Sequence, residues 1–248
     1  MALDFTLRKY TELLKSIMES GYEILTVERF LNKSKHKRVV VLRHDVDKRP
    51  LTSLLMATIE HKLGVNSTYY FRLSTFKPKI VARISSLGHE VGYHYEVVDK
   101  SKGDLSKAWR MFKQELGYMR KFVSIVTASQ HGNPLSKWNN LSLWDSHDFH
   151  EVKLIGEAYL SFMNINITYV SDTGMSWSSH FSVKDTLPTA VSLKNTDELI
   201  RRIQQNNENF YILVHPDKWS ISFFGWCFNI STQSAKNLIK FLIKRVRA

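Results

Sequence analysis

Apolar and polar positions follow two periods along this chain, one typical of strands and one typical of helices. Runs rich in β-branched and aromatic residues predict strands at 39–46, 66–73, 89–98, 123–128, 165–170 and 210–214. Apolar positions three or four apart predict helices at 4–20, 50–63, 78–87, 104–122, 196–205 and 234–247, while 157–162 could form a helix and 24–31 fits either type. Strands that alternate with helices indicate a parallel sheet covered by helices.

Length and composition narrow the class of protein. The 248 residues are 43% hydrophobic and 23% charged, which suits one globular domain, 1–248, with an N-terminal extension over 1–34. One cysteine, Cys227, cannot form an internal disulfide and favours a reducing compartment. We find no apolar stretch typical of a signal peptide or a membrane span, so we expect a cytoplasmic protein. Nothing in the sequence predicts the oligomeric state.

The formal net charge is +12, which raises the question of nucleic-acid binding. The basic residues are spread over the predicted helices, and no zinc-finger, RNP or basic-zipper pattern is present. We therefore expect no nucleic-acid partner. Dispersed positive charge is either solvated surface or a means of attracting anionic substrates, such as nucleotide-linked or acidic sugars.

The strand predicted at 39–46 ends in ionisable side chains. Its last part reads Arg43-His44-Asp45-Val46-Asp47, and residues two apart in a strand share a face, so Asp45 and Asp47 point together while His44 points away. Two close carboxylates repel each other unless a cation or a hydrogen-bond donor compensates them. The pair therefore indicates either a divalent-metal site or a polar strand end that is hydrogen-bonded to loops.

Imidazoles follow three other predicted strands. His94 lies near the end of one strand, on the same face as Glu96, and His131 and His215 follow two more. Because the carboxyl ends of parallel strands converge in α/β folds, we expect these side chains to meet Asp45 and Asp47 at one site.

Three stretches resemble the motifs of a known enzyme family. They are Arg43-His44-Asp45-Val46-Asp47, Gly88-His89-Glu90-Val91-Gly92-Tyr93-His94-Tyr95-Glu96 and Leu213-Val214-His215-Pro216. In this order they are similar to motifs of the polysaccharide deacetylases, the NodB-homology enzymes of carbohydrate esterase family 4, and to a divergent branch, the WbmS-like polysaccharide deacetylases. The resemblance covers about residues 22–219. It implies a distorted (β/α) barrel of six to eight parallel strands, here with an N-terminal helical extension.

The resemblance also implies roles for single residues. Asp45 would be the general base, and His215 the general acid that protonates the leaving amine. Asp47 and His94 would bind a divalent metal, zinc or alternatively cobalt, nickel or manganese. Such a metal lowers the pKa of a water and polarises the acetyl carbonyl.

The chain departs from the family pattern at two places. The second metal histidine of the family lies four residues after the first, where this chain has Val98. Catalytic zinc has three protein ligands, so Glu96, Asp99 or His131 would supply the third; we favour His131, followed by Glu96. The arginine-proline motif that braces the catalytic aspartate is also absent, and Arg43 either replaces this brace or the brace is missing.

The substrate pocket is predicted from fewer signals. We assign Glu96, Asp172 and Arg43 to substrate binding, although Ser171-Asp172-Thr173-Gly174 fits a plain turn equally well. Three tryptophans, Trp177, Trp219 and Trp226, would either stack on sugar rings or lie in the core.

The resulting hypothesis is a metal-dependent hydrolase that removes N-acetyl or O-acetyl groups from a carbohydrate, a surface-polysaccharide precursor. Two alternatives stay open. One is a metal-free hydrolase of another C–N bond that uses Asp45, His131 and His215 directly. The other is a non-catalytic carbohydrate-binding relative that keeps the pocket.

Overall fold

The computed structural model describes residues 3–33, 37–177 and 187–247. Its strands are β1 (Glu23–Leu25), β2 (Val39–Val46), β3 (Thr68–Phe71), β4 (Glu90–Tyr95), β5 (Thr127–Gln130), β6 (Gly156–Glu157), β7 (Thr168–Ser171) and β8 (Phe210–Val214). Its α-helices are α1 (Leu7–Glu19), α2 (Val27–Asn32), α3 (Pro50–Lys62), α4 (Pro78–Ser86), α5 (Val97–Lys100), α6 (Leu105–Met119), α7 (Thr196–Gln205) and α8 (Phe223–Arg247). Short 3₁₀ helices are η1 (Asn140–Asp145), η2 (Phe149–Val152), η3 (Leu160–Phe162) and η5 (Pro216–Lys218).

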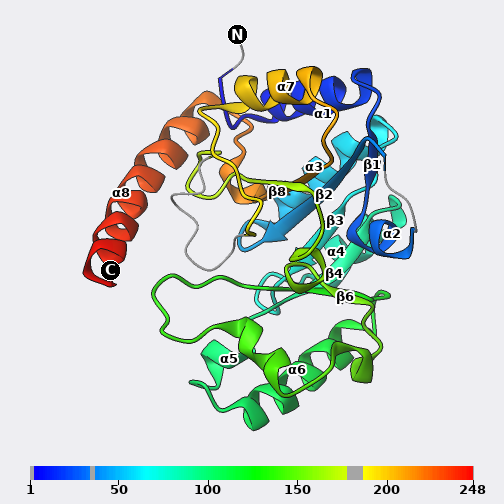
Figure 1. Ribbon diagram of the computed structural model, residues 1–248, viewed down its shortest axis with the longest axis vertical. Coiled ribbons are helices and arrows are strands. Elements are labelled where there is room, and N and C mark those ends of the chain that lie inside the picture. The colour runs from blue at the N-terminus through cyan, green and yellow to red at the C-terminus, as the bar shows by residue number, and fades with distance from the viewer. Residues whose placement is uncertain (1–2, 34–36, 178–186, 248) are drawn as a thin grey trace.

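The strands form one parallel sheet that curls into a half-barrel with helices around it (Figure 1). Its order is β6-β5-β4-β3-β2-β8-β7, and β1 pairs with the first half of β2. In the described part of the chain no pairing joins β6 to β7, so the barrel is open there. The predicted distorted (β/α) barrel is confirmed. Residues 1–34 contribute β1 to the sheet as well as α1 and α2.

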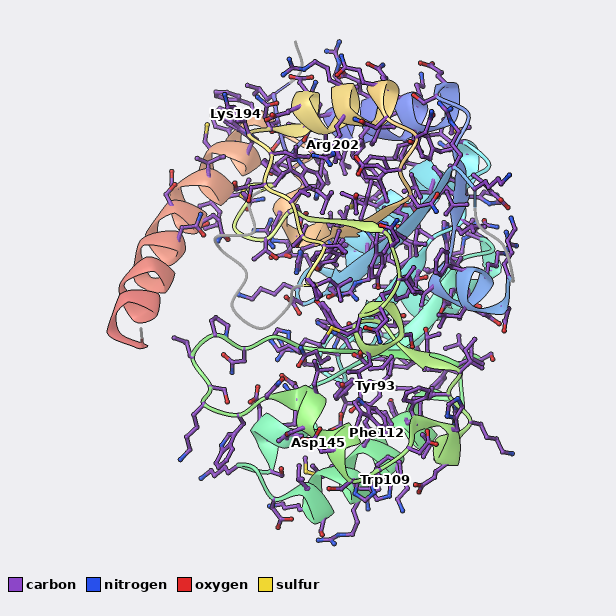
Figure 2. All side chains as sticks on the ribbon, viewed as in Figure 1. Tyr93, Trp109, Phe112, Asp145, Lys194 and Arg202 are labelled. Carbon is purple, nitrogen blue, oxygen red and sulfur yellow. The ribbon has the colours of Figure 1, made fainter. Side chains whose placement is uncertain are left out.

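The outer face of the sheet is covered by two groups of helices. Val40 and Leu42 of β2 pack with Leu14 of α1 and Leu199 of α7 on one side, where Figure 1 shows these two helices together. On the other side α4 and α6 cover β3 and β4, and Figure 2 shows Tyr93 of β4 close to Trp109 and Phe112 of α6. The Tyr93 and Phe112 ring centroids are 5.0 Å apart.

The inner face of the barrel is filled by large side chains below its carboxyl-terminal mouth. Val39 and Val41 of β2 pack there with Tyr70 and Tyr211, all fully buried. Gly92 makes this possible, because a Cβ at its position would lie 2.2 Å from the Tyr70 ring. The strand pattern thus separates an apolar inner layer from the polar side chains at the strand ends.

The strand predicted at 89–98 is shorter in the structure. β4 ends at Tyr95, and Val97 begins the short helix α5. Asn140 causes this change of direction, since its Oδ1 accepts hydrogen bonds from the backbone N–H groups of Val98, at 3.0 Å, and Asp99, at 3.2 Å. This cap from a distant residue outweighs the β-propensity of the two valines.

Two more predicted elements differ from the structure, one in position and one in type. The strand predicted at 123–128 lies at Thr127–Gln130, because the Arg120 guanidinium donates two hydrogen bonds to the Ile125 carbonyl and holds that segment in a turn. The segment 157–162 is not an α-helix: Glu157 ends β6, and its carboxylate accepts hydrogen bonds from Tyr159 N and Leu160 N. These bonds bend the chain into η3.

The last helix starts eleven residues before the predicted position. α8 begins at Phe223, after Ser222, whose Oγ accepts a hydrogen bond from Gly225 N at 3.2 Å. α8 extends away from the other elements along the left of Figure 1. Among the described residues, no helix combines the length and the apolar composition that a membrane crossing needs.

Candidate active site at the carboxyl ends of the strands

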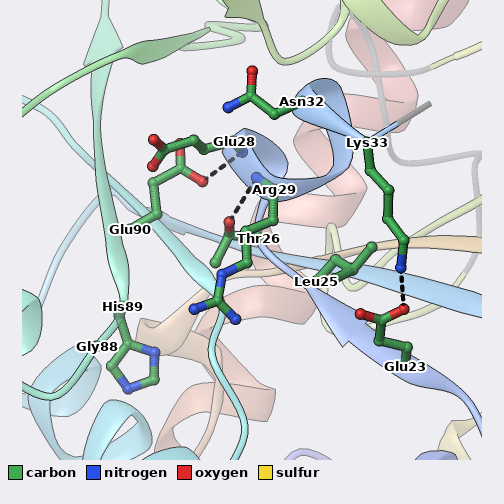
Figure 3. Close-up of a pocket in the computed structure, with 10 residues that line it drawn as sticks. All are labelled: Glu23, Leu25, Thr26, Glu28, Arg29, Asn32, Lys33, Gly88, His89 and Glu90. Atoms are coloured by element: carbon green, nitrogen blue, oxygen red, sulfur yellow. Dashed lines mark hydrogen bonds and ion pairs between the residues drawn. The ribbon is translucent and has the colours of Figure 1, made fainter.

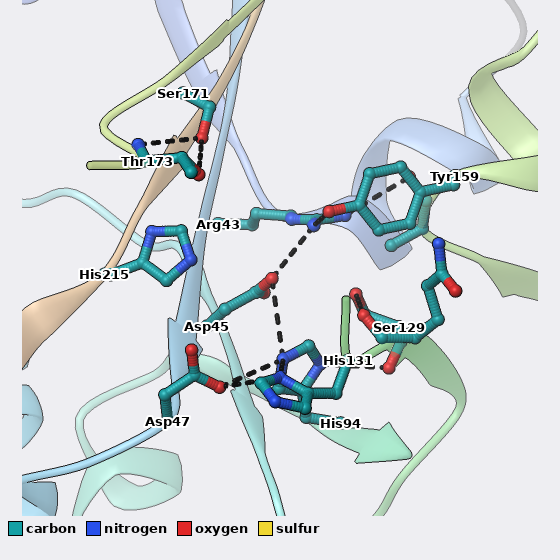
Figure 4. Close-up of polar contacts among 12 residues, drawn as sticks. Arg43, Asp45, Asp47, His94, Ser129, His131, Tyr159, Ser171, Thr173 and His215 are labelled. Atoms are coloured by element: carbon teal, nitrogen blue, oxygen red, sulfur yellow. Dashed lines mark hydrogen bonds and ion pairs between the residues drawn. The ribbon is translucent and has the colours of Figure 1, made fainter. Parts of the chain in front are cut away.

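Strand register brings five of the predicted side chains to one place. Val214 of β8 pairs with His44 of β2, so His215, the next residue, lies at the level of Asp45 on the neighbouring strand. His94 of β4 pairs with Ser129 of β5, and His131 follows that strand. Figure 4 shows His94 and His131 on one side of Asp45 and Asp47, and His215 on the other.

Asp45 points into the barrel and is bound by a buried arginine. The Arg43 Nη2 donates to Asp45 Oδ2 at 3.0 Å, and both residues are at most 2% exposed. Arg43 also donates to the hydroxyls of Tyr159, at 2.6 Å, and Tyr211, at 2.8 Å, and its guanidinium lies 4.3 Å from the Tyr159 ring centroid. Burial disfavours the charge, but the Asp45 carboxylate and the neighbouring tyrosines together outweigh it and raise the pKa of Arg43.

The two oxygens of Asp45 therefore differ. Oδ2 accepts from Arg43, whereas Oδ1 is buried and has no hydrogen-bond partner among the described residues. A buried carboxylate oxygen without a partner is costly, which indicates that it serves a proton or a ligand. His44, whose side chain leaves the opposite face of β2, does not reach this site and bonds with Glu60 at 2.7 Å.

Asp47, His94 and His131 form a cluster that could hold a metal ion. Their ligand atoms lie within 4.8 Å of one another. Asp47 Oδ1 is 3.1 Å from His131 Nδ1 and 3.4 Å from His94 Nε2, and the two imidazole nitrogens are 3.3 Å apart. One carboxylate and two imidazoles are a ligand set typical of catalytic zinc and similar transition metals.

Hydrogen bonds with backbone carbonyls orient the two histidines of this cluster. His94 Nδ1 is 3.0 Å from the Ser129 carbonyl, which fixes the proton on Nδ1 in the neutral ring and leaves the Nε2 lone pair facing Asp47. A metal ligand requires that arrangement, so the donor set fits a divalent cation. His131 is positioned by its backbone, because its N–H donates to the Tyr95 carbonyl at 2.8 Å.

The electrostatics of the cluster follow from burial and mutual attraction. Burial opposes ionisation of Asp47, but the imidazoles of His131 and His94 hold its pKa well below the usual value. Burial likewise disfavours the His94 imidazolium, yet the carboxylates of Asp45 and Asp47 raise its pKa. Positive charge is thus stabilised at the point where these side chains meet.

His215 forms a buried pair with Asp172. His215 Nδ1 lies 2.5 Å from Asp172 Oδ1, and its backbone N–H donates to Asp172 Oδ2 at 2.9 Å. Trp219 donates its indole N–H to the same Oδ2, and the Lys218 ammonium is 3.6 Å from Oδ1. Although burial disfavours the carboxylate, Lys218 and His215 lower the pKa of Asp172. Asp172 thus orients the His215 ring through Nδ1, while Nε2 has no hydrogen bond from the described residues.

The other predicted site residues lie elsewhere. Glu96 forms ion pairs with Arg72 and Lys100, and Asp99 accepts hydrogen bonds from Ser136 and Asn140. Neither carboxylate belongs to the Asp47 cluster. Trp177 and Trp219 are buried in the core between the sheet and α1, at most 1% exposed, whereas Trp226 is partly exposed.

Sequence patterns had not singled out several residues that support the site. Tyr159 and Tyr211 hold Arg43, Ser129 orients His94 through its carbonyl, and Lys218 lies beside Asp172. Tyr211 and Leu213 share the inner face of β8, so the direction of the Tyr211 side chain was readable from the strand period. Tyr159 lies in a segment without a clear period and gave no such signal.

A separate hollow of about 560 Å³ lies near the amino-terminal ends of β1 and β4 (Figure 3). The Glu90 carboxylate accepts a hydrogen bond from Glu28 N at 2.9 Å and one from Thr68 Oγ1 at 2.6 Å. Burial raises the pKa of Glu90. This hollow is at the opposite end of β4 from His94, so it plays no part in the site described above.

Comparisons with known proteins give matches by structure only. No family model and no curated protein matches this sequence. Among solved structures, the chain is similar to the peptidoglycan deacetylase PdaC from Bacillus subtilis in a mutant form, at 14% identity and a TM-score of 0.44, over 83% of this chain and 97% of that one. It is also similar to a CE4 esterase from Streptococcus mutans, at 12% identity and a TM-score of 0.48, over 88% and 86% of the two chains.

A third similar structure is a CE4 family pseudoenzyme from Bacillus anthracis, at 12% identity and a TM-score of 0.45, over 83% of this chain and 62% of the other. Similarity at this level assigns no role to any side chain of this protein.

Proposed function

We propose that this protein is a metal-dependent hydrolase that removes N-acetyl or O-acetyl groups from a carbohydrate, a surface-polysaccharide precursor, and that it represents a WbmS-like branch of the polysaccharide deacetylases. One observation carries the proposal. Asp47, His94 and His131 present three ligand atoms within 4.8 Å of one another, next to a buried carboxylate, Asp45. The single cysteine supports a reducing compartment as its location.

Asp47, His94 and His131 would hold the metal, with zinc as the expected ion. A divalent cation at this point lowers the pKa of a water molecule and polarises an acyl carbonyl. His94 is prepared for this role by the Ser129 carbonyl, which keeps its Nε2 unprotonated in the neutral ring.

Asp45 serves as the general base. Its Oδ1 is free of hydrogen bonds from the described residues and can accept the proton of the attacking water, while Arg43 holds Oδ2 and fixes the direction of the carboxylate. Arg43 is fully buried and so acts through Asp45 instead of contacting the substrate. It takes the place of the arginine brace that the chain lacks elsewhere.

His215 serves as the general acid. Asp172 accepts from Nδ1, so Nε2 is the ring nitrogen left for the substrate, and when both nitrogens are protonated the Nε2 proton can be given to the leaving amine or alcohol as the tetrahedral intermediate collapses. Asp172 thus positions the His215 ring, a task different from the direct substrate contact predicted for it.

Acetate release and metal content together test this function. Protein purified without chelators is analysed for transition metals, and acetate is measured after incubation with N-acetylated oligosaccharides and nucleotide-linked N-acetyl sugars. We expect about one metal ion per chain and acetate release that chelation abolishes. Stoichiometric metal with no acetate from any of these substrates would contradict the proposal.

A metal-free hydrolase of another C–N bond is the second candidate. The direct contact of His131 Nδ1 with Asp47 Oδ1, at 3.1 Å, favours it, because these groups already compensate each other's charge. In that case Asp45, His131 and His215 would act directly. Elemental analysis separates the candidates: hydrolysis by protein without bound metal is expected only for the second one.

A further inference from the structure

A second hollow, of about 250 Å³, adjoins the active site. Lys48 and Arg49, which follow β2, form one part of its wall, Asp217 and Lys218 of η5 form another, and α8 supplies the rest, including Asn229. We refer to it as the α8 pocket. It is formed by parts of the chain that also build the active site.

The wall of the α8 pocket lies next to the active site. Lys48 and Arg49 directly follow Asp47, and Lys218 follows His215 by three residues. The Lys218 ammonium lies 3.6 Å from Asp172 Oδ1, the oxygen that bonds with His215 Nδ1. A substrate whose acetyl group lies between Asp45 and His215 therefore has this pocket beside it.

The amide side chains of the pocket already take part in hydrogen bonds. Asn229 donates through Nδ2 to Ser220 Oγ, at 2.9 Å, and accepts through Oδ1 from Arg49 Nη1, at 3.1 Å. Gln233 donates to Asn237 Oδ1 at 2.8 Å. A ligand thus gains few hydrogen bonds from these amides.

Two cationic side chains of the wall, Lys48 and Arg49, have no carboxylate partner among the described residues, whereas Lys218 is paired with Asp172. Lys48 is exposed, and its ammonium has no ion pair or hydrogen bond within the described chain. Arg49 is held over the pocket by its bond with Asn229 and by a left-handed backbone at φ 51°. Because Lys218 is paired with Asp172, the wall has Lys48 and Arg49 against one carboxylate, Asp217, and its charge still favours an anion.

We propose that the α8 pocket binds the anionic group, a phosphate or a carboxylate, of an acidic N-acetyl sugar whose acetyl group lies in the neighbouring active site. Lys48 and Arg49 contact that group, and they determine specificity without taking part in the hydrolysis. The inference rests on the proposed deacetylase function and names the substrate class for the same site.

Calorimetric titration of the full-length protein tests this inference with three probes. These are N-acetylglucosamine 1-phosphate, N-acetylmuramic acid and the uncharged methyl glycoside of N-acetylglucosamine. We expect at least one charged probe to bind about tenfold more tightly than the uncharged one, since a hydrogen bond with a charged group contributes that much. The charged probe that binds more tightly distinguishes phosphate from carboxylate recognition. Equal affinity for all three would overturn the inference.

Matched variants test whether the α8 pocket causes the tighter binding of charged probes. Lys48→Gln and Arg49→Gln are each expected to weaken binding of the charged probe about tenfold and to leave the uncharged probe unchanged, and Arg49→Lys should keep most of the preference. Lys107→Gln removes an equal charge from the exposed start of α6 and should change neither affinity. A preference that survives both pocket variants would place the anion on the metal cluster and contradict the proposal.

Acetate release with the same probes keeps the two proposals apart. Charged probes that bind through Lys48 and Arg49 but release no acetate would disprove the deacetylase function and leave the anion pocket standing. Equal rates of acetate release from charged and uncharged sugars would support the function and contradict the pocket.

Discussion

The buried Arg43–Asp45 pair is the central interaction at the residue scale. Arg43 satisfies its charge with one carboxylate and two tyrosine hydroxyls inside the barrel, at 2.6 to 3.0 Å. A buried ion pair of this kind contributes less through its net energy than through the large cost of leaving one partner alone. The pair therefore fixes the carboxylate that the proposed reaction needs.

Removing only the arginine should destabilise the protein. For Arg43→Met we expect a loss of about 3 to 5 kcal/mol in the free energy of unfolding, because Asp45 is left buried without its partner. Urea unfolding measures this loss. The double variant Arg43→Met with Asp45→Asn should recover much of the stability but no activity. A loss of stability in the double variant equal to the sum of the losses in the two single variants would contradict the coupling.

Substitutions of Asp45 and of Asp47 should differ in their effects on metal content and on acetate release. Asp45→Asn is expected to lower acetate release by about 10³-fold or more with metal content unchanged, since it removes only the base. Asp47→Asn should lose the metal as well, because it removes the carboxylate ligand of the cluster. Glu96→Gln, outside the cluster, serves as the control and should retain metal. Wild-type turnover in Asp45→Asn would rule out the assigned role.

Asp172 should act through His215. Asp172→Asn replaces the carboxylate acceptor at His215 Nδ1 with an amide, so the imidazole adopts the wrong tautomer more often. We expect kcat to fall about 10² to 10⁴-fold with KM and metal content little changed. A purely structural role would instead lower the melting temperature and leave kcat of the folded protein intact.

At the scale of elements, a buried carboxylate joins α3 to the sheet. Glu60 of α3 is fully buried and bonds with Tyr10 of α1, His44 of β2 and Tyr69 of β3. Burial disfavours its charge, but His44 and the hydroxyl donors lower the pKa of Glu60 to about 2. This network lies behind β2, on the face opposite Asp45, and holds the strand that carries both aspartates.

The Glu60 network should make stability depend on acid pH. Because the folded-state pKa of Glu60 is about 2 and the ordinary value is 4.5, its contribution is complete above pH 4.5 and is lost as the pH falls towards 2. We therefore expect Glu60→Gln to be less stable than wild type at pH 7 and the difference to shrink below pH 4.5. Chemical denaturation between pH 2.5 and 7 measures it.

Glu19→Gln, on the exposed end of α1, is the matched control for this series. It should follow the wild-type pH dependence. A constant difference between wild type and Glu60→Gln across the pH range would show that the ionised carboxylate is not the stabilising form.

At the scale of the whole molecule, curling of the sheet brings the ends of distant strands to one cluster of side chains that could hold a metal ion. Asp47 follows β2, His94 lies in β4 and His131 follows β5, so a bound cation would connect the ends of three strands. Any ligand that binds only the folded protein stabilises it in proportion to the logarithm of its concentration over Kd.

Metal removal should therefore lower the melting temperature. At a free metal concentration about 1,000 times Kd the stabilisation is about 4 kcal/mol, and chelation should remove it. Differential scanning calorimetry with and without a chelator measures the shift, and re-addition of zinc should reverse it. Asp47→Asn should show no shift with chelator. If the melting temperature of the wild-type protein changes neither with chelator nor with added zinc, no metal is bound by this cluster.

The alternation within β2 and β4 could be read directly from the sequence. Asp45 faces the barrel interior while His44 faces the helices, and Glu90, Gly92 and His94 share the inner face of β4, as the strand period predicts. This works because the pleat is local: neighbouring side chains must leave opposite faces whatever the rest of the chain does. Most helices were found for a similar reason, since their caps and apolar spacing lie within a few residues.

Tertiary structure decided which polar side chains meet. Glu96 and His131 both follow strands and were comparable by sequence, yet Arg72 and Lys100 draw Glu96 away while the Tyr95 carbonyl holds His131 beside His94. The partners of Arg43 and His215 are likewise far apart in the chain, at Tyr159 and Asp172. Such contacts depend on strand order and on the curl of the sheet, which are set by packing over the entire molecule, so no local pattern encodes them.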